Sequence, residues 1–142
     1  AFEVRDNALN RIEANDCEDF ILVNFANADM VGHTGKLEAA IKAVETVDRC
    51  AGEIVAAVRA RGGAAIVTAD HGNAEQMFDP HTQAPHTAHT LYDVECIIAA
   101  DGLNRTTPLR NGGRLADVFP TALALMGLDQ PEAMTGRSLI EP

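Results

Sequence analysis

The 142-residue sequence contains no tryptophan, and aromatic residues make up only 4% of it, so its core must be aliphatic and rich in alanine. Basic residues are also scarce: 11 lysines and arginines stand against 21 acidic residues, leaving a formal net charge of −10. This charge disfavours nucleic acid or an anionic membrane as a partner. No apolar run is long enough to span a bilayer, and we expect no signal peptide among the first residues given.

Cysteine and serine are rare as well. Cys17, Cys50 and Cys96 are widely spaced and include no CxxC pair, which argues against a zinc knuckle or a disulfide framework. Reduced thiols in a cytoplasmic protein explain them most simply. Ser138 is the only serine, and the chain begins with Ala1 instead of methionine. We expect either a removed initiator or a piece of a longer protein.

What the chain does contain predicts one folded domain. Its 46% hydrophobic content argues against disorder. Helical spacing of apolar residues predicts three helices, at residues 2–15, 37–61 and 115–126. Unbroken apolar runs predict three buried strands, at residues 20–25, 64–68 and 94–99. Pro120 should sit in a first helical turn, which divides the last helix into two pieces.

The order of these elements indicates the fold class. A strand, a long helix and a second strand follow one another along residues 20–68, which is a βαβ unit whose crossover should be right-handed. The strand at 20–25 lacks polar alternation, so both of its faces should be covered, as in a parallel sheet. We therefore predict an α/β fold with a mostly parallel sheet flanked by helices on both faces.

An acidic residue and a histidine follow each of the first two predicted strands. Asp70 and His71 come directly after the strand at 64–68, and Asp29 and His33 follow the strand at 20–25. Asp29 and His33 share a face on a helical turn and can also converge on a tight loop. Ligands of open α/β sheets bind beyond the carboxyl ends of the strands. Each pair alone is compatible with an ordinary polar turn, but two such pairs favour a cation site.

The loop over residues 75–90 supplies further candidates. It has two prolines and no periodicity, so no regular element is predicted there, and long loops in compact domains tend to be functional. It contains three of the five histidines of the chain: His81, His86 and His89. His86 and His89 are three residues apart, and they need not both bind a metal.

Together these segments suggest a metal site. The candidate ligands are Asp29, His33, Asp70, His71 and His89. Carboxylate and imidazole ligands without thiolate suit manganese or zinc. Five ligands are too many for one tetrahedral metal and natural for a pair, and paired metals about 3.5–4 Å apart clamp a phosphoryl group.

The chain offers no clear nucleophile for phosphoryl transfer. A covalent intermediate needs an activated serine or threonine, and Ser138 lies far in sequence from every candidate ligand. The threonines that adjoin the ligands are predicted to be local hydrogen-bond partners: Thr34, Thr68, Thr87 and Thr90.

Longer motifs resemble a known family. The matching segments are Asn24–Gly35, Thr68–Met77, Pro85–Thr90, Gly113–Val118 and Met134–Leu139. They resemble the cofactor-independent phosphoglycerate mutases, which belong to the alkaline phosphatase superfamily, and the likeness covers nearly all of the chain. The Asp-His-Gly core alone would indicate only the superfamily, whereas the first motif is much more specific.

The resemblance implies an enzyme that interconverts 3-phosphoglycerate and 2-phosphoglycerate in glycolysis and gluconeogenesis. Such enzymes use a phosphoserine intermediate and two manganese ions, with zinc or another divalent metal as the alternative. Asp29, His33 and His89 match the ligands of one metal, and Asp70 and His71 match ligands of the other. The nucleophilic serine, a further aspartate ligand and the basic residues that grip the substrate would lie upstream, outside this chain.

Residues 1–142 would then be the C-terminal segment of a discontinuous, alkaline phosphatase-like domain that is incomplete here. The implied partners are a small phosphorylated substrate and the remaining N-terminal part of the same polypeptide, in a monomeric parent protein. The isolated chain should bind manganese without turning over phosphoglycerate. Two other interpretations stay open: another superfamily enzyme, such as a phosphopentomutase or phosphodiesterase, and a non-catalytic metal-binding module.

Overall fold

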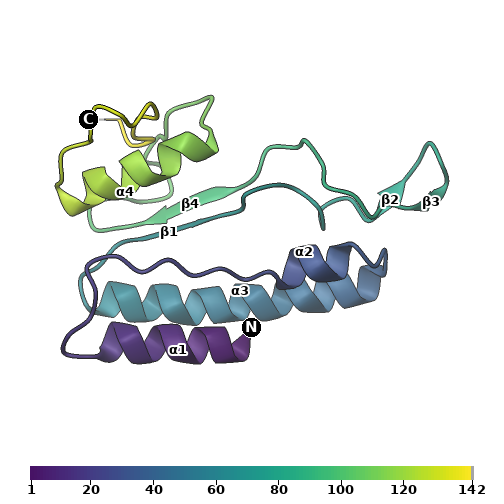
Figure 1. Cartoon of the computed structure of the whole chain (residues 1–142), viewed down its shortest axis with the longest axis horizontal. Helices are drawn as coiled ribbons and strands as arrows, with labels where there is room; N and C mark the ends of the chain where they lie inside the picture. Colours follow the sequence, from purple (N-terminus) through teal and green to yellow (C-terminus); the bar gives the residue numbers. More distant parts are fainter. Residues whose placement is uncertain (142) are drawn as a thin grey trace.

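A computed structural model describes residues 1–141 and arranges them in layers. The elements in order are α1 (Phe2–Glu13), α2 (Asn27–Gly32), α3 (Leu37–Ala60), β1 (Ala65–Thr68), β2 (Phe78–Asp79), β3 (Ala84–Pro85), β4 (Cys96–Ala99), a 3₁₀ helix η1 (Leu115–Asp117) and α4 (Val118–Met126). The strands β1 and β4 lie between the layer of α1, α2 and α3 and the helix α4 (Figure 1). No helix within residues 1–141 has both the length and the apolar character needed to cross a membrane.

The central sheet is antiparallel. β1 pairs with β4 so that Ala65 lies opposite Ala99 and Thr68 lies opposite Cys96. The predicted strands at 64–68 and 94–99 are thus confirmed, each slightly shorter than expected. The prediction of a mostly parallel sheet is not confirmed within residues 1–141, where both ladders, β1–β4 and β2–β3, are antiparallel. The reason is the connection: no crossover helix separates β1 from β4, and a parallel pair requires one.

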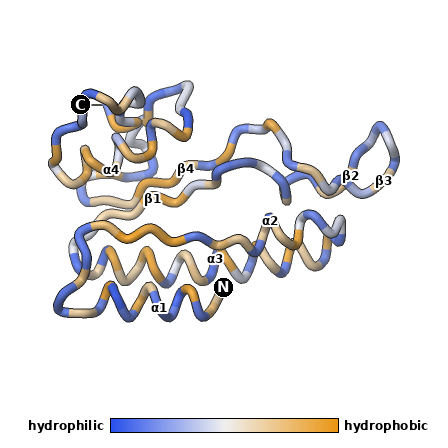
Figure 2. Tube along the Cα trace, in the orientation of Figure 1, coloured by the Kyte–Doolittle hydropathy of each residue, from blue (hydrophilic) through white to orange (hydrophobic). Residues whose placement is uncertain are grey.

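The segment at residues 20–25, predicted to be a buried strand, joins no ladder. It crosses the molecule between α3 and β1 and runs in the same direction as β1 (Figure 1). Figure 2 shows most of this segment in hydrophobic colours, with a hydrophilic position toward its end, where the sequence has Asn24. Leu22 is nevertheless 84% exposed, so the expected cover on both faces is missing. The predicted βαβ unit therefore lacks its first strand within the described residues.

The long helix α3 forms the centre of the layer of α1, α2 and α3, because both other helices pack against it. It buries Ala40 and Cys50, and α1 packs along it with Ala8 and Ile12 buried. After its last turn Gly62 takes a left-handed conformation, with φ of +75°, which is common for glycine at the end of a helix. The buried hydrophobic residues of the described chain include no aromatic side chain, in keeping with the composition.

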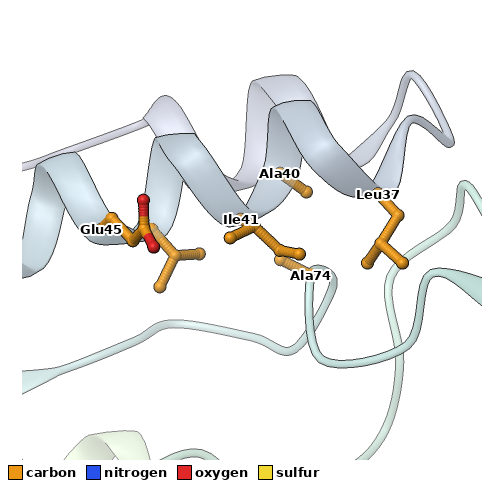
Figure 3. Close-up of a pocket in the computed structure, with 6 residues that line it drawn as sticks. Leu37, Ala40, Ile41, Glu45 and Ala74 are labelled. Atoms are coloured by element: carbon orange, nitrogen blue, oxygen red, sulfur yellow. The ribbon is translucent and has the colours of Figure 1, made fainter.

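One side of α3 remains uncovered. Leu37, Ile41 and Val44 are about half exposed and, together with Ala40, Glu45 and Ala74, line a shallow groove of about 270 Å³. Figure 3 shows Ala74, from the turn after β1, facing Ile41 of α3. The apolar stripe predicted for this helix is therefore only partly buried by the described residues.

The C-terminal segment is tied to the start of α4 by the buried Asp117. Its Oδ1 accepts a hydrogen bond from the backbone N–H of Arg137 at 2.9 Å. Its Oδ2 accepts from the Arg110 guanidinium at 2.6 Å and from the backbone N–H of Arg114 at 3.0 Å. The Arg137 hydrogen bond, followed by those of Arg110 and Arg114, outweighs burial and lowers the pKa of Asp117 to about 2.

The start of α4 and the loop over residues 75–90 test two local predictions. Pro120 lies in the first turn of α4, after the separate 3₁₀ helix η1, so the predicted division of the last helix is confirmed. The absence of any regular element in the loop over residues 75–90 is not confirmed, because β2 and β3 pair there through Phe78–Pro85 and Asp79–Ala84. This hairpin is too short for its pattern to be visible in the sequence.

Candidate metal centre

The short helix α2 positions the first acid–imidazole pair. Asp29 lies within α2 and His33 is its C-terminal cap, so the two side chains lie on one face, one turn apart. The Nε2 atom of His33 is 3.1 Å from Oδ1 of Asp29. Of the two alternatives left by the sequence, a helical turn or a tight loop, the structure has the helical turn.

His89 completes a triangle with this pair. Its Nε2 atom lies 3.1 Å from Oδ1 of Asp29 and 3.2 Å from Nε2 of His33. The Nδ1 atom of His33 lies 2.7 Å from the carbonyl oxygen of Thr87. A carbonyl oxygen only accepts, so the His33 proton belongs on Nδ1 and the lone pair of Nε2 faces the triangle.

His71 lies beside this triangle, and Asp70 lies beside His71. The rings of His71 and His89 stack with their centroids 3.7 Å apart. Ligand atoms of Asp29, His71 and His89 all lie within 4.8 Å of one another. Asp70 belongs to no such group within residues 1–141: its Oδ1 lies 3.7 Å from Nε2 of His71, and its side chain is 75% exposed.

The structure brings together some of the five candidate ligands and leaves one apart. Asp29, His33 and His89 converge, His71 joins them through its stacked ring, and Asp70 stays at the edge. The other two histidines of the loop lie outside the group. His81 belongs to the β2–β3 hairpin, where its N–H donates to Asp79, and Nδ1 of His86 is buried without a hydrogen-bond partner in residues 1–141.

The geometry of the triangle fits a divalent cation. Ligand atoms bound at about 2.1 Å from one metal lie about 3.0–3.4 Å apart in octahedral or tetrahedral geometry. The three distances here are 3.1, 3.1 and 3.2 Å. One carboxylate and two imidazoles form a donor set suited to manganese or zinc. The residues present therefore fit a metal, and the hydrogen bond from His33 to Thr87 is the outer partner that ligating histidines usually have.

Several polar residues around the site were not identified from the sequence. Asn73, only 5% exposed, donates from Nδ2 to Oδ1 of Asp29 at 3.0 Å. Glu75 accepts the backbone N–H of Asn73 at 2.7 Å and also the hydroxyl of Thr90. Burial raises the pKa of Glu75, but the hydrogen bonds from Thr90 and from backbone N–H groups outweigh it and lower that pKa. The one sequence signal for Asn73 and Glu75 is their place inside the matching segment Thr68–Met77.

The threonines that adjoin the candidate ligands were predicted to be hydrogen-bond partners, and each of them makes a hydrogen bond. Thr34 and Thr68 donate their hydroxyls to backbone carbonyl groups, at 2.6 Å to Val31 and at 2.8 Å to Glu95. Thr90 donates to Glu75, while Thr87 acts through its carbonyl oxygen toward His33. Of these contacts, only that of Thr34 is local in the sequence, and only that of Thr87 involves a candidate ligand directly.

Comparison with known proteins shows the family of this chain. The model of the Metalloenzyme superfamily matches residues 1–130, so the chain belongs to the metalloenzyme superfamily. Among its relatives is the 2,3-bisphosphoglycerate-independent phosphoglycerate mutase of Rhodopirellula baltica, 58% identical over 141 residues. That match covers 99% of this chain and 26% of the relative. The enzyme of the same name from Herpetosiphon aurantiacus is 64% identical over 127 residues, which is 87% of this chain and 23% of the relative.

A solved structure is similar over the same extent. The Leishmania mexicana phosphoglycerate mutase, crystallised at low cobalt concentration, matches with a TM-score of 0.84 and 34% identity. The match covers 99% of this chain and 28% of that chain. The fold is therefore α/β and of the kind found in this superfamily, and superfamily membership supports binding of a divalent metal. The chain spans about a quarter of the length of the relatives it matches.

Proposed function

We propose that Asp29, His33 and His89 hold one divalent cation and that Asp70 and His71 contribute to a second, both manganese, in a phosphoglycerate mutase. The observation that carries this proposal is the triangle of ligand atoms, whose sides of 3.1, 3.1 and 3.2 Å suit a single metal. The reaction comes from the relatives, which share the name of 2,3-bisphosphoglycerate-independent phosphoglycerate mutase. It is the interconversion of 3-phosphoglycerate and 2-phosphoglycerate.

Each side chain has a defined part in this proposal. A bound cation supplies Lewis-acid stabilisation of the phosphoryl oxygens. Asp29 supplies the negative charge of the first site, and the Thr87 carbonyl keeps the Nε2 lone pair of His33 aimed at it. The ring of His71 stacks on His89 and restricts its rotation, which links the two proposed sites.

The proposed reaction needs a nucleophile from outside this chain. The hydroxyl of Ser138 accepts the N–H of Ile140 at 3.1 Å and donates to the carbonyl of the same residue at 3.2 Å. Its segment lies beside α4, on the far side of the sheet from α2 (Figure 1). We propose that a serine nucleophile, a further aspartate ligand and basic substrate-binding residues belong to the N-terminal part of the parent, and that residues 1–142 complete a discontinuous domain.

The same N-terminal part would cover the open side of α3. Leu37, Ile41 and Val44 expose 56%, 49% and 45% of their surface there. The matched relatives are about four times as long as this chain, which provides ample polypeptide for this contact. The apolar groove over Ala40 and Ala74 is then an internal surface of the parent protein.

A chimera tests this function. The experiment replaces the matching quarter of the Rhodopirellula baltica mutase with this chain and measures the interconversion of the two phosphoglycerates in the presence of manganese. We expect an active chimera, with activity lost in the Asp29→Ala and His89→Ala forms and retained in Asp93→Ala, which removes an exposed carboxylate four residues after His89 in the sequence. A folded, manganese-loaded chimera that lacks mutase activity would refute the proposal.

A further inference from the structure

Three separate segments bring the ligands together: α2 and its C-terminal cap carry Asp29 and His33, the turn after β1 carries His71, and the following loop carries His89. Asn73, Glu75 and Thr90 connect these segments by hydrogen bonds, and we call these three residues the polar clasp. We propose that Asn73 is a positioning residue that fixes the Asp29 carboxylate for cation binding, and that Glu75 and Thr90 hold Asn73 in place. This inference rests on the proposed cation site at Asp29.

The contact between Asn73 and Asp29 is specific in its geometry. Nδ2 of Asn73 donates at 3.0 Å to the same carboxylate oxygen, Oδ1, that faces His33 and His89. A carboxylate oxygen accepts along more than one lone-pair direction. The amide therefore occupies one direction and leaves another aimed at the triangle, which restricts the rotation of the carboxylate.

A glycine on α2 makes room for this contact. A Cβ atom at Gly32 would lie 2.0 Å from Oδ1 of Asn73, far closer than two such atoms can approach. Gly32 is three residues after Asp29 on the same short helix. The side chain of Asn73 is therefore seated against the backbone of α2, one turn from the carboxylate that it holds.

Glu75 fixes Asn73 and joins it to the loop of His89. Oε2 of Glu75 accepts the backbone N–H of Asn73 at 2.7 Å, and Oε1 accepts the hydroxyl of Thr90. Thr90 directly follows His89, and its N–H donates to the carbonyl of Gly72 at 2.9 Å. The polar clasp thus ties the turn after β1 to both other ligand-bearing segments.

A positioning role and a purely structural role predict different results. If the polar clasp only stabilises the fold, its loss lowers the temperature of unfolding without changing the cation affinity of the folded chain. If it positions Asp29, its loss weakens cation binding, because free rotation of the carboxylate must be arrested when the metal binds. Residues that orient metal ligands typically change metal affinity by about 10–100-fold.

The test measures manganese affinity of the 142-residue chain by isothermal titration calorimetry. We expect Asn73→Ala to weaken binding about 10-fold or more. We expect Thr90→Val, which keeps the shape of the side chain and removes the hydroxyl, to weaken it by a smaller factor. Two matched controls should bind manganese with the affinity of the unaltered chain. Gln76→Ala changes a residue of the same turn. Thr46→Val removes a hydroxyl that donates to the Lys42 carbonyl oxygen within α3.

Two further readouts keep the result decisive. The thermal unfolding of each metal-free variant shows whether the chain is folded, and the visible spectrum of bound Co²⁺ should change in Asn73→Ala because the carboxylate is reoriented. Affinities and spectra of Asn73→Ala and Thr90→Val equal to those of the controls would overturn the proposal, provided that His89→Ala loses binding. Equal affinity of the unaltered chain and His89→Ala would instead refute the cation site itself.

Discussion

At the scale of single residues, the carboxylates of Asp117 and Asp29 have different surroundings, which indicate a structural role for Asp117 and a role in cation binding for Asp29. Asp117 is almost fully buried and accepts three hydrogen bonds, from Arg110, Arg114 and Arg137. Asp29 accepts one amide hydrogen bond, from Asn73, and otherwise faces imidazole nitrogens. The three donors satisfy the Asp117 carboxylate without a cation, whereas the Asp29 carboxylate lies among groups that can themselves bind a cation.

Asp117 predicts a dependence of stability on pH. Its pKa is about 2 in the folded chain, against 3.8 for the unfolded side chain. Because the folded pKa is the lower one, the carboxylate stabilises the fold fully above pH 3.8 and loses this contribution as the pH falls toward 2. The contribution is about 2 kcal/mol. Urea unfolding of the chain and of Asp117→Asn should show a stability difference that narrows between pH 4 and pH 2, and a constant difference would contradict this account.

At the scale of elements, α2 is the piece on which the site depends. It spans only Asn27–Gly32, yet it presents Asp29 to two imidazoles and leaves the backbone at Gly32 open to Asn73. Most of its stability must come from packing, because isolated helices of this length do not persist in water. It packs against the long helix α3, which connects the site to the lower layer of the fold.

A pair of glycine substitutions tests this role. Gly32→Ala places a Cβ atom on the Asn73 side chain, so we expect a loss of about 1–3 kcal/mol in the free energy of unfolding and weaker manganese binding. Gly52→Ala is the control, because a Cβ atom meets no neighbour there and alanine favours the interior of α3, with an expected gain of up to about 1 kcal/mol. Chemical unfolding and calorimetry measure both effects. Equal stabilities for the two variants would mean that Asn73 is not seated against α2.

Local sequence patterns predicted the helices and strands better than they predicted how the strands pair. The spacing of apolar residues predicted α1, α3, β1 and β4 because each pattern is contained in the segment itself. The direction of β4 depends on the path of the chain after β1, and the missing ladder at residues 20–25 depends on which neighbours are present. The local pattern contains neither fact, which explains why the predicted parallel sheet is not found within residues 1–141.

For the candidate site, the sequence likewise indicated the residues but not their contacts. Strand ends followed by an acid and a histidine indicated Asp29, His33 and His71, and the histidine-rich loop indicated His89. The sequence could not show that Asn73 is buried against Gly32, because this contact joins residues 41 positions apart. Nor could it show that Asp70 stays exposed at the edge of the group, since that depends on how the turn after β1 is oriented.

At the scale of the whole molecule, the length of the chain and its exposed apolar surface are consistent with a piece of a larger polypeptide. It spans about a quarter of the length of its relatives and exposes apolar side chains along α3. Patches of this kind mark surfaces that contact other protein segments. The site and the open groove lie on adjoining parts of the molecule, since Ala74 of the groove directly follows Asn73 of the polar clasp.

The separated chain should therefore bind metal without catalysis. We expect the 142-residue chain to take up manganese and to leave 3-phosphoglycerate unchanged over the course of a phosphorus NMR assay, because Ser138 is bonded to its own segment. The EDTA-treated chain serves as the control for metal uptake. Conversion to 2-phosphoglycerate by the pure chain would show that a nucleophile within residues 1–142 has been overlooked.

The central claim is that Asp29, His33 and His89 bind a single divalent cation. Anomalous diffraction at the manganese absorption edge, from crystals of the chain grown with Mn²⁺, tests it most directly. We predict a peak about 2.1 Å from Oδ1 of Asp29 and from the Nε2 atoms of His33 and His89. A map without a peak among these three atoms, or with its strongest peak elsewhere on the chain, would contradict the account.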